Sequence, residues 1–597
     1  MRQLSDSAAS DRYAFRVKMR LINSKTLELR EFFEPVAPPY AILSHTWENE
    51  EVSFQDLTDF HRRQPQHHYP ALQARDGFQK IVHTCRLAQD HGIDWVWVDT
   101  CCIDKSSSAE LTETINSMFR WYQKAVVCFA YLGDLSPADD LQDSLQNCRW
   151  FTRGWTLQEL IAPSVVNFYD QRWNIRGTKQ SLASVLSGIT AIEERALLGA
   201  PLHAYRIAVR MSWAAKRVTS RPEDMAYCLL GIFDVNIPLI YGEGIKAFRR
   251  LQEAIIRQSS DMSIFAWEDR TAAENTCVGT LLSPSPAGFG FVSTWTQSRQ
   301  NQISYLFAGN SELTQEYSIT NRGMRIEGSI VHLPVTSNNA AQTAGALCYF
   351  LELFQEYGFI STLDGVSSQN SGLSVGILLQ KIGPHLYARK SGLLTIIPVD
   401  DVLEASRTTQ QVYFVRTDYR GSTASEISAL YRSIVLPVGD EYFITHVSKA
   451  IPESHWDETN RLFFRCSTKD LVFAAMVVVS IKGSSMPLIV VIDQRHLPPA
   501  SHLFHPDAHP DLHRWLYREK HAREPQDWNE FSFKLGAYQD LDSMADTHFE
   551  IGDRLLRIAA SIKDRTVDTT TADGVIGRLR QHYLSLAVSD SIEWSGT

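Results

Sequence analysis

The sequence has few cysteines, no long hydrophobic run and no excess of basic side chains. Its 597 residues include nine cysteines, with one adjacent pair, Cys101 and Cys102, and no CxxC spacing. This count indicates neither a disulfide framework nor a zinc cassette. The longest apolar stretch, Leu471 to Ile481, is about half the length that a membrane-spanning helix needs. We therefore expect no membrane span, and the polar N-terminus without a signal-peptide pattern favours a cytoplasmic protein.

The charge balance argues against polyanionic partners. The chain carries 58 basic and 68 acidic side chains, which gives a net charge of −10, and it has no Lys/Arg-rich run. We expect no nucleic acid among its partners. Hydrophobic residues make up 44% and charged residues 21%, a balance typical of a globular chain, and the length suits two or three domains.

Short apolar runs alternate with helical patterns between about residues 40 and 170. The expected strands are 40–43, 95–98, 126–132 and 165–169, and the expected helices are 71–90, 109–124 and 156–161. Buried strands separated by helices are typical of an α/β fold with a parallel sheet covered on both faces. Helical spacing continues at 181–192, 204–216, 223–233 and 245–258, which predicts a helical extension over about 171–270.

After about residue 271 the pattern changes to that of a β-rich region, 271–597, whose role the sequence does not indicate. Strand-like runs lie at 302–307, 324–333, 347–354, 394–399, 411–415, 463–466, 471–481 and 488–492. Turn residues separate them, which predicts a mostly antiparallel sandwich or barrel, or two of them. Six histidines between His496 and His521 have spacings that suit a metal on a helix, but Pro506 and Pro510 interrupt a helix there. We predict a loop without a metal site.

Polar residues follow directly after the first two apolar strands of the α/β part. The first strand leads into Ser44, His45 and Trp47, and the second into Asp99, Cys101 and Asp104. Because open parallel sheets bind ligands beyond the carboxyl ends of their strands, these six residues are candidate substrate-binding residues. The alternative is that they cap helices and shape turns.

A tight turn at Gly154 precedes a short helix that carries Trp155 and Glu159. These two residues are four positions apart and therefore share one helix face, with an aromatic ring near a carboxylate. The residues alone leave two interpretations open. Glu159 is either a surface carboxylate paired with Arg149 or Arg153, or a functional group.

Five segments, taken in order, resemble the fungal heterokaryon incompatibility (HET) domain. They are 40–47 (YAILSHTW), 95–105 (WVWVDTCCIDK), 109–121 (AELTETINSMFRW), 153–163 (RGWTLQELIAP) and 221–244 (RPEDMAYCLLGIFDVNIPLIYGEG). The resemblance covers about residues 18–270. HET domains in turn remotely resemble the Toll/interleukin-1-receptor (TIR) fold, whose enzymatic members cleave NAD with a Glu on a helix after a Trp-rich turn.

The resemblance implies a TIR/flavodoxin-like domain with a helical extension and a role in vegetative (heterokaryon) incompatibility. Such a protein recognises non-self and triggers programmed cell death. The resemblance further implies that Glu159 is the catalytic residue of NAD hydrolysis to nicotinamide and ADP-ribose, with Trp47 or Trp155 stacked on a ring of the NAD substrate. It implies no bound cofactor, and self-association or another incompatibility protein as partner.

The proposed chemistry needs little more than one carboxylate. Cleavage of the nicotinamide–ribose bond passes through an oxocarbenium-like sugar, as in glycoside hydrolysis, and nicotinamide leaves as a neutral molecule. A carboxylate facing that developing charge lowers the barrier electrostatically. The sequence shows no Gly-rich phosphate cradle. Two other interpretations stay open: a thiol hydrolase built from Cys101 or Cys102 with His45, and a non-enzymatic interaction module that signals death through a partner.

Overall fold

The computed structural model describes residues 17–269 apart from 35 and 64–69, residues 280–292, and separate segments between residues 316 and 590. The chain divides into two compact units. The first contains residues 1–268, 282–314 and 353–372, and the second contains 269–281, 315–352 and 373–597.

The first unit is built on a seven-stranded sheet whose four inner strands are parallel. The strand order is β2-β1-β4-β3-β5-β6-β7, in which β4, β3, β5 and β6 are parallel and the edge strands β1, β2 and β7 pair antiparallel. The bounds are β1 (Lys18–Asn23), β2 (Leu29–Phe33), β3 (Ala41–His45), β4 (Trp95–Trp97), β5 (Val127–Tyr131), β6 (Val166–Tyr169) and β7 (Ile175–Thr178). Every residue of β3 and β6 is buried, as expected for strands covered on both faces.

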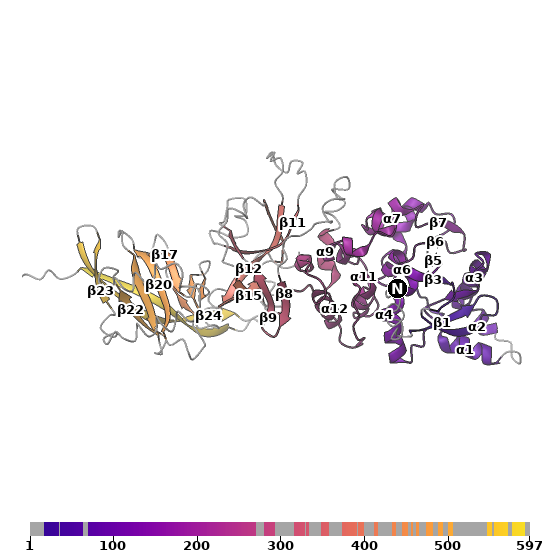
Figure 1. Cartoon of the computed structure of the whole chain (residues 1–597), viewed down its shortest axis with the longest axis horizontal. Helices are drawn as coiled ribbons and strands as arrows, with labels where there is room; N and C mark the ends of the chain where they lie inside the picture. Colours follow the sequence, from indigo (N-terminus) through magenta and orange to yellow (C-terminus); the bar gives the residue numbers. More distant parts are fainter. Residues whose placement is uncertain are drawn as a thin grey trace, which may run out of the picture. The chain divides into compact units, whose positions relative to one another are not determined.

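The connection from β3 to β4 runs toward one edge of the sheet, and the connections from β4 to β5 and from β5 to β6 run toward the other edge. Because β4 lies on one side of β3 and β5 on the other, right-handed crossovers place α3 on one face and α4 and α6 on the other, as Figure 1 shows. The helices of this part are α1 (Phe54–Arg63), α2 (Pro70–Gln73), α3 (Asp76–Asp90), α4 (Ser108–Lys124), α5 (Leu141–Ser144) and α6 (Thr156–Ile161), with 3₁₀ turns η2 (Leu145–Asn147) and η3 (Arg149–Phe151).

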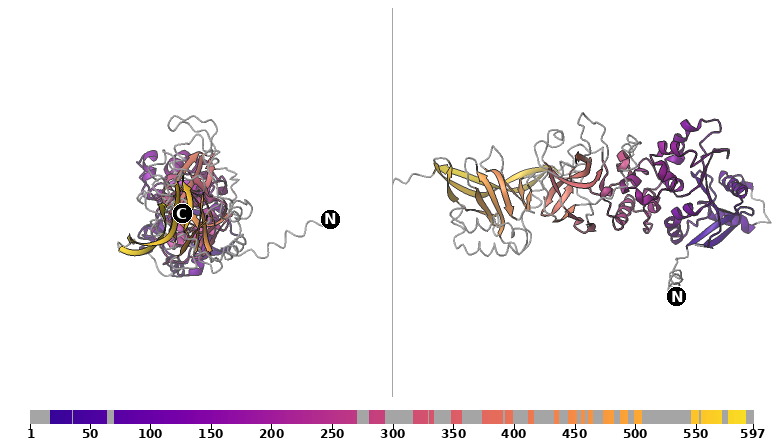
Figure 2. Two further views of the ribbon diagram at one scale, coloured as in Figure 1. Left: turned by 90° about the vertical axis from the view of Figure 1, so that its left-hand side faces the viewer. Right: turned by 45° about the horizontal axis from the view of Figure 1, so that its top comes forward.

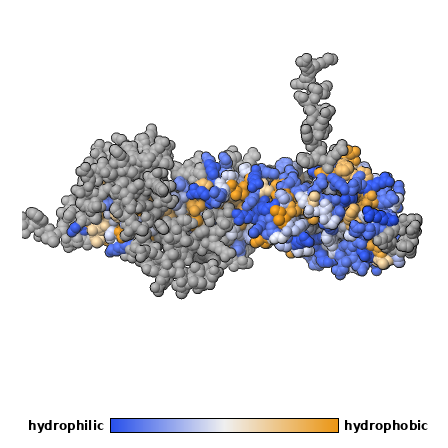
Figure 3. Space-filling view, turned by 90° about the horizontal axis from the view of Figure 1, so that it is seen from below, coloured by the Kyte–Doolittle hydropathy of each residue, from blue (hydrophilic) through white to orange (hydrophobic). Residues whose placement is uncertain are grey.

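Short helices follow the sheet as an extension. They are α7 (Ala183–Thr190), α8 (Glu194–Leu197), α9 (Ile207–Ser212), α10 (Asp224–Tyr227), α11 (Leu230–Phe233) and α12 (Lys246–Ile256), with 3₁₀ turns η4 (Leu202–Ala204), η5 (Met262–Phe265) and η6 (Pro286–Phe289). Gly231 brings α11 against α4, because a Cβ there would lie 2.0 Å from the Phe119 Cβ. On the face seen in Figure 3, the described surface carries hydrophobic patches separated by hydrophilic residues.

The described part of the second unit consists of β-strands in three sheets. Their orders are β10-β11-β12-β13-β15-β9-β8 with β14 beside β12, then β18-β19-β16-β25-β24-β23, and β17-β20-β21-β22. The bounds are β8 (Glu316–Thr320), β9 (Gly323–Gly328), β10 (Val331–Leu333), β11 (Cys348–Glu356), β12 (Leu373–Gly383), β13 (Leu386–Arg389), β14 (Thr395–Pro398), β15 (Gln411–Val415), β16 (Ile434–Val435), β17 (Ile444–Ile451), β18 (Trp456–Asp457), β19 (Leu462–Phe463), β20 (Phe473–Ile481), β21 (Leu488–Asp493), β22 (Ala500–Phe504), β23 (Asp546–Ile551), β24 (Arg554–Thr570) and β25 (Ile576–Asp590).

Two of these sheets share one hydrophobic core. The buried cluster joins Ile434, Val479, Val490 and Ile558, which come from β16, β20, β21 and β24. The long β24–β25 hairpin, yellow in Figure 2, pairs antiparallel from Leu556–Asp590 to Thr570–Ile576. Most pairings in this unit are antiparallel, with parallel exceptions at β13–β15 and β16–β25. The prediction of a β-rich C-terminal region is confirmed.

The mixed α/β prediction with a parallel sheet is also confirmed, with local differences. The β1–β2 hairpin and β7 are additional strands, and they make the edges of the sheet antiparallel. The single helix predicted over 223–233 is two, α10 and α11, and the one predicted over 71–90 is divided into α2 and α3. The predicted strand 302–307 lies outside the described residues.

Candidate functional site

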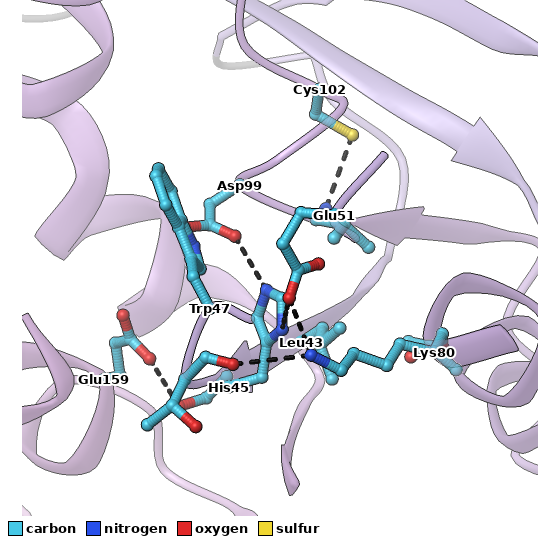
Figure 4. A network of polar contacts seen from close by, with 12 residues as sticks. Leu43, His45, Trp47, Glu51, Lys80, Asp99, Cys102 and Glu159 are labelled. Atoms are coloured by element: carbon cyan, nitrogen blue, oxygen red, sulfur yellow. Dashed lines mark hydrogen bonds and ion pairs between the residues drawn. The ribbon is translucent and has the colours of Figure 1, made fainter. Parts of the chain in front are cut away.

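His45 is held between two carboxylates at the carboxyl ends of β3 and β4 (Figure 4). Its Nε2 lies 3.1 Å from Asp99 Oδ1, and its Nδ1 lies 3.7 Å from Glu51 Oε1. The Trp47 indole N–H donates to the other Asp99 oxygen at 2.8 Å. Asp99 therefore anchors both the imidazole of His45, at the end of β3, and the indole of Trp47, two residues after it.

Glu159 lies on α6 and is 3% exposed. It accepts a hydrogen bond from the Ser44 hydroxyl, which itself accepts one from the Trp150 indole N–H at 2.8 Å. Glu159 is therefore a buried carboxylate that faces β3, and the interpretation of a surface Glu paired with arginine is wrong.

The two carboxylates of this cluster have opposite pKa shifts. Burial, reinforced by the charge of Asp99, raises the pKa of Glu159 to about 7 against an ordinary 4.5, although Arg153, Ser44 and Arg217 oppose the shift. Burial also acts to raise the pKa of Asp99, but the hydrogen bond from His45 and the nearby cations outweigh it and hold that pKa well below its usual range. At neutral pH the cluster can therefore hold one ionised carboxylate beside one poised to gain or lose a proton.

Two cationic side chains lie over the Trp47 ring. The Lys105 ammonium is 3.7 Å and the Arg153 guanidinium carbon 5.2 Å from the ring centroid. Arg153 also donates to the His45 carbonyl at 2.8 Å. Trp47 itself is 43% exposed, so this group forms the solvent-facing side of the cluster.

Lys80 closes the other side of the cluster from α3. Its ammonium lies 2.6 Å from Glu51 Oε1 and 3.3 Å from Glu48 Oε2, although the Lys80 residue is only 4% exposed. A buried amine needs such partners, because an isolated buried charge is costly. Lys80 therefore compensates the carboxylate that faces His45 Nδ1.

The helical extension holds the turn before α6 in place. Gly154 N–H donates to the Val218 carbonyl at 2.8 Å and Val218 N–H to that of Thr152 at 2.7 Å. Arg217, 5% exposed, donates to the Arg153 carbonyl at 2.8 Å and the Thr156 hydroxyl at 2.9 Å. The extension thus fixes the position of the helix that carries Glu159.

Of the residues predicted for the site, Ser44, His45, Trp47, Asp99 and Glu159 are joined by these contacts, and three others have different surroundings. Trp155 hydrogen-bonds Asp224 at the start of α10. Asp104 accepts from the Ser106 backbone N–H at 3.0 Å and the Ser106 hydroxyl at 2.5 Å, which is turn chemistry. Cys101 is completely buried, and burial together with Cys102 raises the pKa of its thiol, the opposite of an activated nucleophile.

Several residues of the cluster are not among those that the sequence pattern singles out. They are Trp150, Arg217, Lys105, Glu51 and Lys80, and the sequence suggests Arg153 only as an ion-pair partner. Polar residues inside apolar patterns, such as Lys80 in the helix DGFQKIVHTC, are a signal that could have identified some of them, because buried charges require partners.

In the described part of the chain, no three His, Cys, Asp or Glu side chains are grouped so that they could hold a metal ion. Of the 496–521 stretch, only residues 499–504 are described, so the prediction made for it mostly lies outside them. Among the described helices, none combines the length and the apolar character needed to cross a bilayer.

Parts of the chain match known protein families and a relative. Residues 40–143 match the family described as heterokaryon incompatibility protein (HET), and residues 246–345 match a domain of unknown function, DUF8212. The vegetative incompatibility protein HET-E-1 of Podospora anserina is 48% identical over 230 residues, which cover 36% of this chain and 16% of that relative. The chain thus matches a small part of that relative. No solved structure matches the chain significantly.

The HET family match spans β3, β4, β5 and the helices between them, and so contains most of the residues around His45 and Asp99. The N-terminal part of the chain therefore contains a match to the heterokaryon incompatibility (HET) domain family, which spans residues 40–143.

Proposed function

We propose that this protein acts in vegetative incompatibility and triggers programmed cell death on non-self recognition, by hydrolysing NAD in its HET domain. The support for the biological role is the relative HET-E-1, whose name describes a vegetative incompatibility protein and which shares 48% identity over the matched region. The incompatibility role and the chemistry are separate parts of the proposal, because the match covers 16% of that relative.

The strand order supports a TIR/flavodoxin-like assignment for the sheet. Numbered by their order in the chain, the parallel strands β3 to β6 lie in the order 2-1-3-4, which is the flavodoxin-like order as far as these four strands reach. In such sheets the ligand site lies at the carboxyl ends next to the first strand, where the topology switches. His45 ends that first strand.

The observation that carries the enzymatic proposal is Glu159, a buried carboxylate with a pKa raised to about 7, at the topological switch point. Strongly perturbed titratable groups in such positions are candidates for catalysis. Asp99, His45 and Trp47, which are hydrogen-bonded to one another, supply an ionised carboxylate, an imidazole and an exposed ring.

In the proposed reaction, the bond between the nicotinamide nitrogen and ribose C1′ breaks and its electron pair leaves with nicotinamide. Ionised Glu159 accepts a hydrogen bond from a ribose hydroxyl and stabilises the oxocarbenium-like charge. A water molecule adds to C1′ and releases one proton, giving ADP-ribose. Ser44 holds the Glu159 carboxylate in position through its hydroxyl.

The burial of Glu159 fits activation by self-association. At 3% exposure for Glu159 and 0% for Ser44, a substrate cannot reach the carboxylate in the described conformation. Arg153, in the turn before α6, is held by its hydrogen bond to the His45 carbonyl. We infer that assembly moves this turn and opens the site, so that the lone chain stays inactive.

The test is NAD consumption by the purified chain, measured as nicotinamide release in dilute and in concentrated protein solutions. We expect turnover that grows faster than linearly with protein concentration and that Glu159→Gln abolishes, by at least 100-fold. The matched control Glu113→Gln changes an exposed carboxylate on α4 and leaves turnover unchanged. Absence of turnover in every form, or equal turnover in Glu159→Gln, would refute the enzymatic proposal.

A non-enzymatic interaction module is the second candidate, and the same burial of Glu159 favours it. In that function Glu159 is a structural carboxylate and the exposed Trp47 belongs to a protein interface. Fungal cells that express Glu159→Gln would then still die, whereas Trp47→Ala would abolish killing.

A further inference from the structure

The Trp47 ring carries two cations that have little else to bind. Within the described part of the chain, the cation–π contact with Trp47 at 3.7 Å is the one polar contact of the Lys105 ammonium. One guanidinium N–H of Arg153 donates to the His45 carbonyl, and the remaining N–H groups have no hydrogen-bond partner among the described residues. Lys105 is exposed and Arg153 partly so, so both can receive a ligand from solvent.

Lys105 and Arg153 lie beside Trp47 on the solvent-facing side of the cluster, near carboxylates. Asp99 and Glu159 are the carboxylates that face them, and the charges of Lys105 and Arg153 act on Asp99, and that of Arg153 on Glu159 as well. Two further cations of the cluster already have partners. Lys80 pairs with Glu48 and Glu51, and Arg217 donates to the Arg153 carbonyl and the Thr156 hydroxyl. An anionic ligand that approached Trp47 would be repelled by Asp99 unless Lys105 and Arg153 received its charge.

We propose that Lys105 and Arg153 form an anion site for the diphosphate of a nucleotide, with the Trp47 ring as stacking surface for one of its planar rings. On binding, the Lys105 ammonium leaves the indole face for a phosphate oxygen and the ligand ring takes its place. This inference rests on the proposed function, because it names how the same site holds a dinucleotide. It also accounts for phosphate binding in a chain without a Gly-rich cradle.

Both halves of the site favour a nucleotide diphosphate over a simple anion. Two cations about one ring can contact two phosphoryl groups, and Arg153 offers the planar fork that binds phosphate in a bidentate way. An indole fixed at its N–H by Asp99, at 2.8 Å, is pre-oriented and loses little conformational entropy on stacking. Inorganic pyrophosphate would use the cations alone, and adenosine the ring alone.

Binding can be measured without turnover, by calorimetric titration of the full-length chain with ADP-ribose, inorganic pyrophosphate and adenosine at two salt concentrations. We expect ADP-ribose to bind most tightly, and Lys105→Gln and Arg153→Gln each to weaken its binding about 10-fold and to reduce its salt dependence. Arg153→Lys retains the charge and should restore part of the affinity. Trp47→Ala should weaken ADP-ribose but not pyrophosphate.

The matched control is Lys246→Gln on α12, an exposed lysine of the extension, which should leave all affinities unchanged. Equal ADP-ribose affinity in wild type, Lys105→Gln and Arg153→Gln would overturn the inference, even if Glu159-dependent NAD cleavage were observed. No binding of ADP-ribose at millimolar concentration would overturn it too. Binding that depends on Lys105 in a chain that never cleaves NAD would support this inference and refute the proposed enzymatic function.

Discussion

The first unit, which contains the HET family match (the HET unit), and the second, β-rich unit both bury charged side chains, but the described residues of the two units surround these charges differently. In the β-rich unit, Glu352, Lys381 and Asp457 are at most 5% exposed and bind groups on other strands. Ser374 donates to Glu352, Tyr349 to Asp457, and Lys381 to the Trp456 carbonyl at 2.6 Å. These contacts tie strands together.

In the HET unit the buried carboxylate Glu159 instead faces another carboxylate, Asp99, which adds to the rise of its pKa. Folding therefore maintains an arrangement that costs stability at neutral pH, and such arrangements cluster at functional sites. The comparison teaches that a buried charge does not by itself indicate a functional site. In the HET unit, the site is indicated by a buried carboxylate next to the strand ends that has a second carboxylate as an unfavourable neighbour.

The largest expected effect is a pH dependence of the free energy of unfolding that is caused by Glu159, and it tests this comparison. The pKa of Glu159 in the folded chain, about 7, is above its ordinary value of 4.5, so folding takes up a proton between these pH values. The stabilisation is complete below pH 4.5 and is lost as the pH rises through 7, by on the order of 3 kcal/mol between pH 4.5 and 8. Urea unfolding of wild type and Glu159→Gln at pH 5 and pH 8 measures it.

Glu159→Gln should remove this pH dependence, while Glu352→Gln in the β-rich unit should retain it. If wild type and Glu159→Gln lost the same stability between the two pH values, the Glu159 carboxylate would not be the group that titrates, and the contrast between the units would fail.

The next effect concerns catalysis and Asp99. Asp99→Asn should lower NAD cleavage by about 100-fold, because His45 and Trp47 lose a charged anchor, which corresponds to about 2.7 kcal/mol. Since the charge of Asp99 helps to raise the pKa of Glu159, the rise of activity with pH should also shift to lower pH. Initial rates from pH 5 to 9 measure both effects.

Asp457→Asn supplies the matched change in the β-rich unit and should alter neither the rate nor its pH profile. An unshifted pH profile in Asp99→Asn would mean that the two carboxylates do not interact, whatever the loss in rate.

A third prediction compares two buried lysines, one in each unit. Lys179 donates to the carbonyls of Leu160, Ile161 and Pro163 at the end of α6, and burial lowers its pKa to about 8. Lys179→Met should cost about 2 kcal/mol, because buried carbonyls lose their donor. It should also reduce NAD cleavage, since this lysine holds the helix that carries Glu159. Thermal unfolding and initial rates measure the two effects.

Lys381→Met in the β-rich unit should cost similar stability and leave cleavage unchanged. Full cleavage by Lys179→Met would show that the position of α6 does not depend on this contact.

Much of the fold could be predicted because buried strands and amphipathic helices impose their own hydrophobic period. The β1–β2 hairpin could not, because its strands KMRLIN and LREFF mix charged and apolar residues, and their pairing depends on the edge of a sheet formed elsewhere in the chain. His45, Asp99 and Glu159 could be singled out from strand ends and the HET resemblance.

The burial of Glu159 could not be predicted, because nothing within TLQELI requires it. It results from Trp150, which binds Ser44, and from Arg217, which holds the turn before α6. Trp155 shows the opposite case. Its spacing from Glu159 suits a shared site, yet the contact that the structure supplies is with Asp224 of the extension.

The smallest predicted effect distinguishes the roles of Trp47 and Trp155, which the sequence analysis predicts to contact the same substrate. Trp155→Phe removes the indole N–H that Asp224 accepts and should cost about 1 kcal/mol of stability, with the KM for NAD unchanged. Trp47→Phe removes the anchor to Asp99 and should raise that KM several-fold. Tyr349→Phe, which removes a hydroxyl bound to Asp457, is the β-rich counterpart of Trp155→Phe and should match it in both readouts. If Trp155→Phe raised the KM for NAD, Trp155 would belong to the substrate site. The comparison would then be weakened, because a contact classed as structural would also bind substrate.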